Sequence, residues 1–208
     1  METHSYKTYN EYITTQTKVS KMKKGRSNID KHIAVISNVK DSITERCNGK
    51  EKILCVGARN CNEVRAFRKL FPETDITAID LSGIKNKWGL EINKWVNGCY
   101  VHFMDMNKLE FEDNSFDIIY AHHSLEHNPT PQKAAQEFVR VIKDGGIVYV
   151  IVPLLENPTD VECTKYEDEG DIAILFTGHI KRILHCRIYE AGEDMAEEKE
   201  LRFAFEAI

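Results

Sequence analysis

Residues 52–80 read KILCVGARNCNEVRAFRKLFPETDITAID, and this stretch decides the fold. It opens with Ile53 to Val56, a short and unbroken apolar run that is typical of a strand covered on both faces of a parallel sheet. The chain then turns at Gly57. Residues 75–80 predict a second strand, which ends in the carboxylate of Asp80. The order of these elements predicts a βαβ unit.

The segment between the two strands predicts a helix. Asn60 and Glu63 have the spacing of a capping box, and apolar residues recur behind them at helical intervals. In such a unit the turn at Gly57 lets backbone N–H groups at a helix N-terminus face a ligand. Asp80 can accept hydrogen bonds from two vicinal ribose hydroxyls. The stretch therefore predicts a nucleoside-binding half-domain.

The turn discriminates among nucleoside cofactors. A dinucleotide fingerprint needs G-x-G-x-x-G, so that a pyrophosphate can sit on the helix N-terminus. Only Gly57 is a glycine here, and Arg59 and Cys61 stand where others would be expected. A pyrophosphate-containing cofactor is therefore disfavoured.

The length, net charge and cysteine content restrict the classes of protein to which this chain can belong. The 208 residues are enough for one well-buried domain, and the net charge of −5 gives no field that would attract nucleic acid or an anionic membrane. The six cysteines include no C-x-x-C pair, and the polar first residues lack the apolar core of a signal peptide. We expect reduced thiols in a cytoplasmic protein without a membrane segment.

A second acid follows the next strand. Tyr100 to Met104 predict that strand, which ends at Asp105. The carboxylate of Asp105 can accept a hydrogen bond from the exocyclic amine of adenine. Ligands of open α/β sheets sit at the carboxyl ends of the strands, so Asp80 and Asp105 are expected to hold ribose and base together.

Outside the strands described above, the first half of the chain is expected to be mainly helical. Residues 1–50 form an N-terminal helical segment in which Ser27 caps a helix to Asn48, and residues 51–208 form the rest of a single domain. An aromatic stripe near the start is expected to pack on the domain, or alternatively to close over a ligand as a lid; it consists of Tyr6, Tyr9 and Tyr12. A further helix is expected from Gly83 to Val96, with a buried face of Ile84, Trp88, Ile92 and Trp95.

Two later stretches carry a family resemblance together with the turn at Gly57. The sequence AHHSLEH at residues 121–127 follows a predicted fourth strand, and RVIKDGG at residues 140–146 precedes a fifth. In order and spacing these stretches resemble class I S-adenosylmethionine-dependent methyltransferases, which often carry A-S-H-x-L-E-H and R-x-L-K-P-G-G at these places. The turn resembles motif I of that family, but departs from it at Cys55, Arg59 and Cys61. The matches run from about residue 52 to residue 153.

The resemblance implies a fold and a cofactor. The fold is α/β and Rossmann-like, with a seven-stranded, mostly parallel sheet, helices on both faces and an antiparallel last strand. The cofactor is S-adenosylmethionine. Arg59 either pairs with the methionine carboxylate of the cofactor or points outward to Glu63. The residues expected to bind the cofactor are Gly57, Ala58, Arg59, Asp80, Leu81, Asp105, Met106 and Ala121.

The implied chemistry is in-line methyl transfer to an oxygen or nitrogen of a small molecule or saccharide. No [N/D]-P-P-[Y/F] motif for holding a flipped base follows the fourth strand, so a nucleic-acid substrate is not expected. A hydroxyl nucleophile benefits from a base with a pKa near neutrality. The candidates, in order of preference, are His123, His122 and His179.

The sequence is also compatible with two other classes of protein. The departures in motif I suggest a non-catalytic domain that keeps the fold. The stretch from His123 to His127 also matches H-x-x-E-H, a zinc signature in which a helix presents two histidines. Because Asn128-Pro129 would break such a helix at once, no metal is expected.

Overall fold

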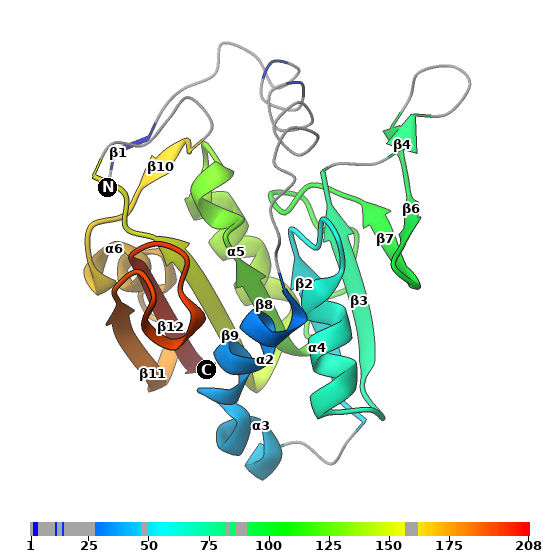
Figure 1. Ribbon diagram of the computed structural model, residues 1–208, viewed down its shortest axis with the longest axis horizontal. Coiled ribbons are helices and arrows are strands. Elements are labelled where there is room, and N and C mark those ends of the chain that lie inside the picture. Colours follow the sequence, from blue (N-terminus) through cyan, green and yellow to red (C-terminus); the bar gives the residue numbers. More distant parts are fainter. Residues whose placement is uncertain are drawn as a thin grey trace.

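The structure is a computed structural model that describes residues 2–3, 11, 14, 28–46, 50–81, 84–85, 91–156 and 162–208 (Figure 1). Its centre is an eight-stranded sheet, one strand more than the sequence predicted. In spatial order the strands are β11 (Ile180–Tyr189), β12 (Glu200–Ala207), β9 (Ile142–Pro153), β8 (Phe116–His122), β2 (Lys52–Val56), β3 (Asp75–Asp80), β7 (Cys99–Phe103) and β6 (Lys94–Val96).

The direction of the strands confirms the α/β, mostly parallel architecture. Neighbouring strands from β9 to β7 are parallel to one another. At one side β12 lies antiparallel between β9 and β11, and at the other β6 pairs antiparallel with β7. The expected antiparallel last strand is therefore present, and β6 is the additional strand.

Helices cover both faces of this sheet. The described α-helices are α2 (Ile29–Ser37), α3 (Lys40–Arg46), α4 (Asn62–Leu70), α5 (Pro131–Val141) and α6 (Glu169–Ala173). Short 3₁₀ helices are η1 (Leu125–His127), η2 (Ile174–Phe176) and η3 (Glu193–Met195). Two small strand pairs lie outside the main sheet: β1 (Glu2–Thr3) with β10 (Thr164–Lys165), and β4 (Ile84–Lys85) with β5 (Glu91–Ile92). Within the described ranges, no helix combines the length and the apolar character needed to cross a membrane.

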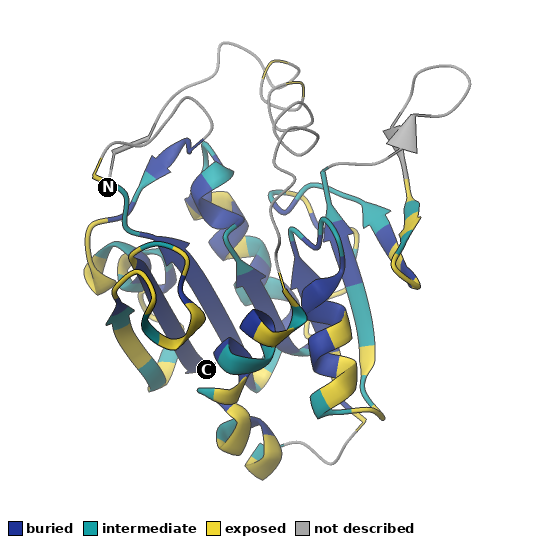
Figure 2. Ribbon diagram, in the orientation of Figure 1, coloured by how far each residue is buried: buried dark blue, intermediate teal, exposed yellow. Residues whose placement is uncertain are grey.

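The side chains of the strands alternate between two cores, so the central strands are buried on both faces (Figure 2). Val35 and Ile36 of α2 and Phe67 of α4 pack on one face, against Tyr120 and Tyr149. The other core contains Phe138 of α5, together with Ile172, Phe176, Phe203 and Phe205. Residues 29–46 thus belong to the same packed unit as the sheet.

The start of the first long helix differs from the prediction. Asn28 is the N-cap of α2, and its side chain accepts a hydrogen bond from the N–H of Asp30. The helix does not run unbroken to Asn48, because a turn at Asn38 and Val39 separates α2 from α3. Ser27 and the aromatic stripe of Tyr6, Tyr9 and Tyr12 lie outside the described residues.

The helix predicted from Gly83 to Val96 is wrong for the residues that the structure describes. These residues form β4, β5 and β6, and the side chain of Trp95 is 72% exposed. The reason is a tight hairpin: Val96 pairs with Cys99, and both Asn97 and Gly98 between them have positive φ. Asn-Gly is the strongest short hairpin signal, and it overrides the helical spacing of the apolar residues.

Candidate functional site

The carboxyl ends of the parallel strands meet at one edge of the sheet, the upper edge in Figure 1. Val56 at the end of β2 pairs with Ala121 of β8, and Asp80 at the end of β3 pairs with Phe103 of β7. The N–H of Met104 donates to the carbonyl of Asp80 (3.2 Å). The turn at Gly57, Asp80 and Asp105 therefore lie along the same edge, as the sequence predicted.

The turn after β2 requires a glycine. Gly57 has φ +76°, and a Cβ at this position would lie 2.5 Å from the Cβ of Ser124. The N–H groups of Gly57 and Ala58 both donate to the carbonyl of Ile79 (2.9 Å each), which fixes the turn to β3. The close approach of Ser124 brings the chain after β8 directly over the turn.

The beginning of α4 differs from the predicted capping box. Cys61 is the N-cap, in a left-handed conformation with φ 60°, and its side chain makes no capping hydrogen bond. The side chain of Asn60 accepts from the N–H of Asn62 (3.4 Å). Glu63 is buried instead of capping, and burial raises the pKa of its carboxyl to about 7.

Two cations interact electrostatically with Asp80. The ammonium of Lys94 is 3.9 Å from its carboxylate, and both side chains are almost buried. Arg59 is half-buried; burial lowers the pKa of its guanidinium, while the charge of Asp80 opposes this decrease. The acid that acts on Arg59 is therefore Asp80, whereas the sequence had suggested Glu63 as a partner.

The second acid of the edge is built into a turn. Asp105 accepts a hydrogen bond from the N–H of Asn107 (2.9 Å), and its carbonyl accepts from Lys108 (3.0 Å). Met106 beside it is buried, and Leu81 after β3 is half-buried. These residues lie where the cofactor was expected.

Three imidazole rings lie in contact at the end of β8: His122 and His123 are stacked, and His32 is tilted by 59° against His122. The ring of His122 lies 4.4 Å from that of His123 and 4.7 Å from that of His32 in α2, measured between centroids. Burial lowers the pKa of His32 to about 3 and holds the pKa of His122 well below its usual value. Within the described part of the chain, Nε2 of His122 has no hydrogen-bond partner. His122 is therefore a half-buried residue whose imidazole is neutral and whose Nε2 is shielded from solvent.

His123 lies between two carboxylates. Its Nε2 is 3.0 Å from Oε2 of Glu200, and its Nδ1 is 3.5 Å from Oε1 of Glu198. Glu200 is fully buried; although burial raises its pKa, His123 and the neighbouring cations Lys31 and Arg202 hold it at about 2. Glu200 is thus an ionised group in the interior.

His179, the third candidate base, is not at this site. Ile180 directly after it pairs with Ala207 at the far end of β12, and the carbonyl of His179 accepts from the N–H of Ile208 (3.1 Å). Glu200, at the other end of β12, is the residue near His123. The structure places His179 at the opposite edge of the sheet, which corrects its assignment as a catalytic residue.

The H-x-x-E-H stretch does not form a zinc helix. Leu125–His127 is a single 3₁₀ turn, in which Nε2 of His127 lies 3.7 Å from Oε1 of Glu126. Among the described residues, a different group has metal-ligating atoms within 4.8 Å of one another, namely His122, His123 and Glu200. Arg202 at 2.8 Å and Lys31 at 3.5 Å already bind the Glu200 carboxylate, and their charges oppose a further cation there.

Several polar residues of this region were missed by the sequence analysis. In the described part of the chain, Oγ of Ser124, Oε2 of Glu126 and the hydroxyl of Tyr166 are buried without a hydrogen-bond partner. Ser124 and Glu126 stand in the stretch that carried the family resemblance, and that was their only signal. Glu200 and Arg202 had a weaker sequence signal, because each is a charged residue next to an apolar residue of a predicted strand.

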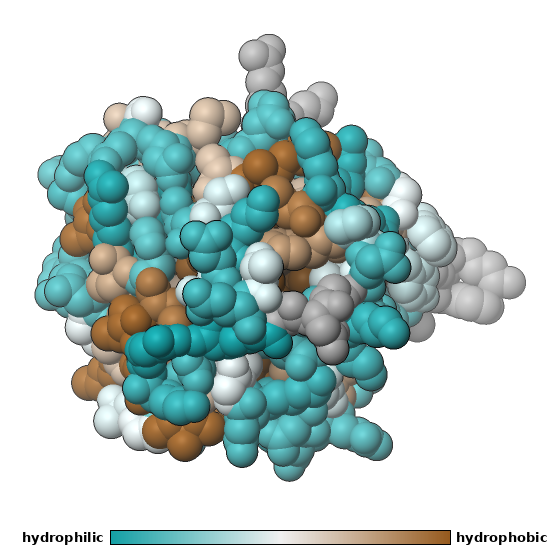
Figure 3. All heavy atoms as spheres, turned by 90° about the horizontal axis from the view of Figure 1, so that it is seen from below, coloured by the Kyte–Doolittle hydropathy of each residue, from teal (hydrophilic) through white to brown (hydrophobic). Residues whose placement is uncertain are grey.

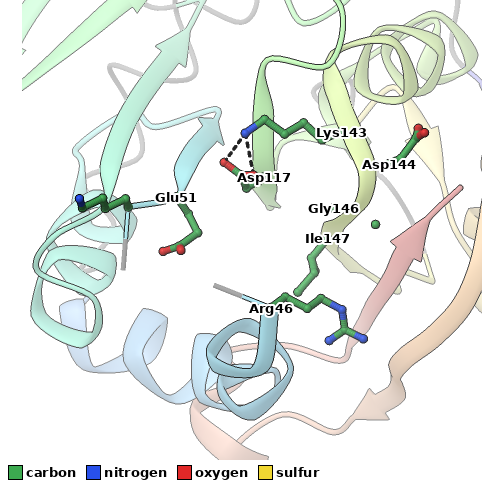
Figure 4. Close-up of a pocket in the computed structure, with 9 residues that line it drawn as sticks. Arg46, Glu51, Asp117, Lys143, Asp144, Gly146 and Ile147 are labelled. Carbon is green, nitrogen blue, oxygen red and sulfur yellow. Dashed lines mark hydrogen bonds and ion pairs between the residues drawn. The ribbon is translucent and has the colours of Figure 1, made fainter. Parts of the chain in front are cut away.

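A separate pocket of about 340 Å³ lies at the opposite edge of the sheet (Figure 4). Its basic residues Arg46, Lys50 and Lys143 are matched by acids, and Lys143 forms an ion pair with Asp117 (2.7 Å). Seen from below, this edge is mainly hydrophilic, with hydrophobic residues at several separate places (Figure 3). Because the positive and negative charges balance, the pocket has no preference for an ionic ligand. Asp80 and Asp105 lie at the other edge of the sheet.

The sheet has the strand order of a class I methyltransferase-type α/β domain, with a glycine turn after its first strand and acids after the next two. Residues 54–150 match the family model described as a methyltransferase domain. This part of the chain is similar to that family, and the resemblance seen in the sequence is confirmed.

Relatives of known sequence and structure agree with this assignment. The uncharacterized methyltransferase C1B3.06c of Schizosaccharomyces pombe is 31% identical over 107 residues, which cover 47% of this chain and 38% of that protein. The demethylmenaquinone methyltransferase of Staphylococcus haemolyticus is 34% identical over 74 residues, 36% of this chain and 31% of that protein. The chain thus spans less than two fifths of the length of these curated relatives.

Solved structures share the fold over most of the chain. A 1,6-didemethyltoxoflavin-N1-methyltransferase of Burkholderia thailandensis, solved with bound 1,6-didemethyltoxoflavin and S-adenosylhomocysteine, has a TM-score of 0.68. The alignment covers 98% of this chain and 92% of that chain at 14% sequence identity. The likeness establishes the class I methyltransferase fold.

Proposed function

We propose that this chain binds S-adenosylmethionine and transfers its methyl group to an oxygen or nitrogen of a small molecule or saccharide. The observation that carries the proposal is the edge formed by Gly57, Asp80 and Asp105. At this edge Gly57 allows Ser124 to lie close over the turn, and two acids stand at successive strand ends. The hydroxyl of Ser124 beside Gly57, which has no hydrogen-bond partner among the residues that the structure describes, is a further polar group for a ligand at the turn.

The residues of the edge fit the parts of this cofactor. Asp80 accepts hydrogen bonds from the ribose hydroxyls, and Asp105 accepts one from the adenine amine. Gly57 and Ala58 lie under the methionine part, and Arg59 supplies a positive charge for its carboxylate. When bound, the cofactor supplies a methyl group activated by a sulfonium centre. The chain's own task is to align the acceptor and to remove its proton.

For that proton we propose His123 as the general base. It stands at the end of β8, one residue before Ser124, which covers the cofactor turn. His122 is less suited, because its Nε2 is buried, burial holds the pKa of its imidazole well below the usual value, and the ring lies between two others. The acceptor itself is not identified by these residues.

Calorimetric titration with S-adenosylhomocysteine tests the cofactor site. The wild type is expected to bind, and Asp80→Asn is expected to weaken binding at least about tenfold, because each hydrogen bond to a charged group contributes about 1.5–3 kcal/mol. Asp75→Asn is the matched control, since Asp75 is exposed at the other end of β3. Absence of binding by the wild type, or equal affinities for both variants, would refute the proposal.

A second candidate is a domain that binds the nucleoside without catalysing transfer. The departures from motif I at Cys55, Arg59 and Cys61 favour it. For such a domain we expect the same binding of S-adenosylhomocysteine in the titration. We expect no methyl transfer from labelled S-adenosylmethionine to any of a panel of hydroxyl and amine acceptors. Transfer to one acceptor would eliminate this candidate.

A further inference from the structure

We infer that Glu200 and Arg202 of β12 form a positioning pair, which holds His123 in the tautomer with its hydrogen on Nε2 and leaves Nδ1 as the proton-accepting atom. The role in catalysis rests on the proposed function, whereas the tautomer itself can be measured without substrate. Neither residue touches the reacting atoms. Both are supplied by a strand about 80 residues away from His123 in the sequence.

The first step is the identity of the donor in the bond between His123 and Glu200. The Glu200 side chain is fully buried, and Oε2 lies 3.0 Å from Nε2 of His123. Arg202 at 2.8 Å and Lys31 at 3.5 Å bind this carboxylate and keep it ionised, so that Glu200 can only accept hydrogen bonds. The hydrogen in this bond must therefore be carried by Nε2 of His123.

The second step is that the carboxylate cannot turn away. Nε of Arg202 donates to Oε1 of Glu200 (2.8 Å). The Arg202 guanidinium is itself fixed: it binds the side chains of Asn38 (2.9 Å) and Asp194, and lies 3.9 Å from the ring centroid of Tyr189. Arg202 thus fixes the plane of the carboxylate, and the carboxylate fixes the imidazole.

The third step concerns the backbone of His123. Its φ is 47°, in the left-handed region that costs a non-glycine residue about 1–3 kcal/mol. The conformation is held by the bond from its N–H to the carbonyl of Ile151 (2.9 Å) and by the contact with Glu200. Such strain is kept where the surrounding structure demands one orientation of a side chain.

The other ring nitrogen faces a more open environment. Nδ1 of His123 is 3.5 Å from Glu198, whose side chain is 44% exposed. In the proposed reaction the acceptor atom bonds to the methyl carbon as the sulfonium carbon–sulfur bond breaks, and its proton passes to Nδ1. The imidazolium that forms is stabilised by ionised Glu200, without a proton transfer to Glu200.

The tautomer can be read from the ¹⁵N chemical shifts of the imidazole, assigned by comparison with His123→Gln and recorded at alkaline pH, where imidazole is neutral. We expect the wild type to carry its hydrogen on Nε2. In Glu200→Gln the carboxylate partner that remains is Glu198, 3.5 Å from Nδ1, so the hydrogen is expected to move at least partly to Nδ1. Glu198→Gln is the matched control and should keep the wild-type tautomer.

Three outcomes would overturn the inference: a wild-type hydrogen on Nδ1, identical spectra for the two glutamine variants, or a displacement of the His122 and His123 signals by equimolar zinc. The wild-type spectrum alone shows which ring nitrogen of His123 carries the hydrogen, so the inference is tested even if Glu200→Gln does not fold. Affinity for S-adenosylhomocysteine is expected to change less than about twofold in Glu200→Gln, whereas Asp80→Asn should lose affinity and keep the tautomer. The inference and the proposed cofactor site can therefore fail separately.

Discussion

Replacing Glu63 by glutamine tests the electrostatics of the core beneath the candidate site. Glu63 is 6% exposed, and its carboxylate lies 3.9 Å from Nε2 of His32. Burial, reinforced by the charge of Asp80, raises the pKa of Glu63 from 4.5 to about 7. The folded protein therefore holds a proton on Glu63 that the unfolded chain releases at lower pH.

The sign of the effect follows from this difference. Between pH 4.5 and about 7 the folded state binds more protons than the unfolded state, so the free energy of unfolding falls as the pH rises through this interval. The interval corresponds to about 3 kcal/mol. Glutamine does not titrate, so Glu63→Gln should match the wild type near pH 4.5 and be more stable by about 2–3 kcal/mol at pH 8.

Urea unfolding at a series of pH values measures this difference directly. His32 has a pKa of about 3 when folded and 6.5 otherwise, so the stability that it contributes declines as the pH falls below 6.5. Because His32 is present in both proteins, its contribution largely cancels from their difference. Glu110→Gln, at an exposed position, is the control and should follow the wild type. Parallel curves for Glu63→Gln and the wild type would refute the reasoning.

Two further predictions concern the turn and the loop before β8. Gly57→Ala should destabilise the protein by about 1–3 kcal/mol more than Gly145→Ala in thermal unfolding, because both glycines have positive φ but only a Cβ at Gly57 meets Ser124; equal losses would contradict the close approach. Arg140 donates to Glu137, Asp113 and the carbonyls of Leu109 and Phe111, so Arg140→Lys should cost about 1–2 kcal/mol in urea unfolding. Arg65→Lys, at an exposed position, should cost almost nothing, and a similar cost for both would contradict the role of Arg140.

The central fold could be predicted from the sequence because its signals are local. The apolar run at Ile53 to Val56 forms β2, and the strands ending at Asp80 and Asp105 lie where expected, apart from a difference of one residue at the end of β7. The edge with Gly57 and the two acids follows from strand order alone. These features need no knowledge of contacts across the chain.

The errors arose where two local signals competed. Trp88, Ile92 and Trp95 have helical spacing, but the Asn97-Gly98 turn folds Trp95 into an edge strand. The capping box at Asn60 failed because Cys61 takes a left-handed conformation at the helix start. The partners of His123 were beyond prediction for another reason: Glu198 and Glu200 come from a segment far away in the sequence, and only tertiary packing brings them to His123.

The place of β12 in the sheet bears on how the chain folds during its synthesis. β12 is inserted between β9 and β11, and its Arg202 binds Asn38 of the turn after α2. Until residue 207 has left the ribosome, β9 keeps an unpaired edge with the apolar sequence Ile147 to Val152. A nascent chain at that stage exposes a strand on which other chains can add, so chaperone dependence and aggregation should be greatest in the interval before β12 is made.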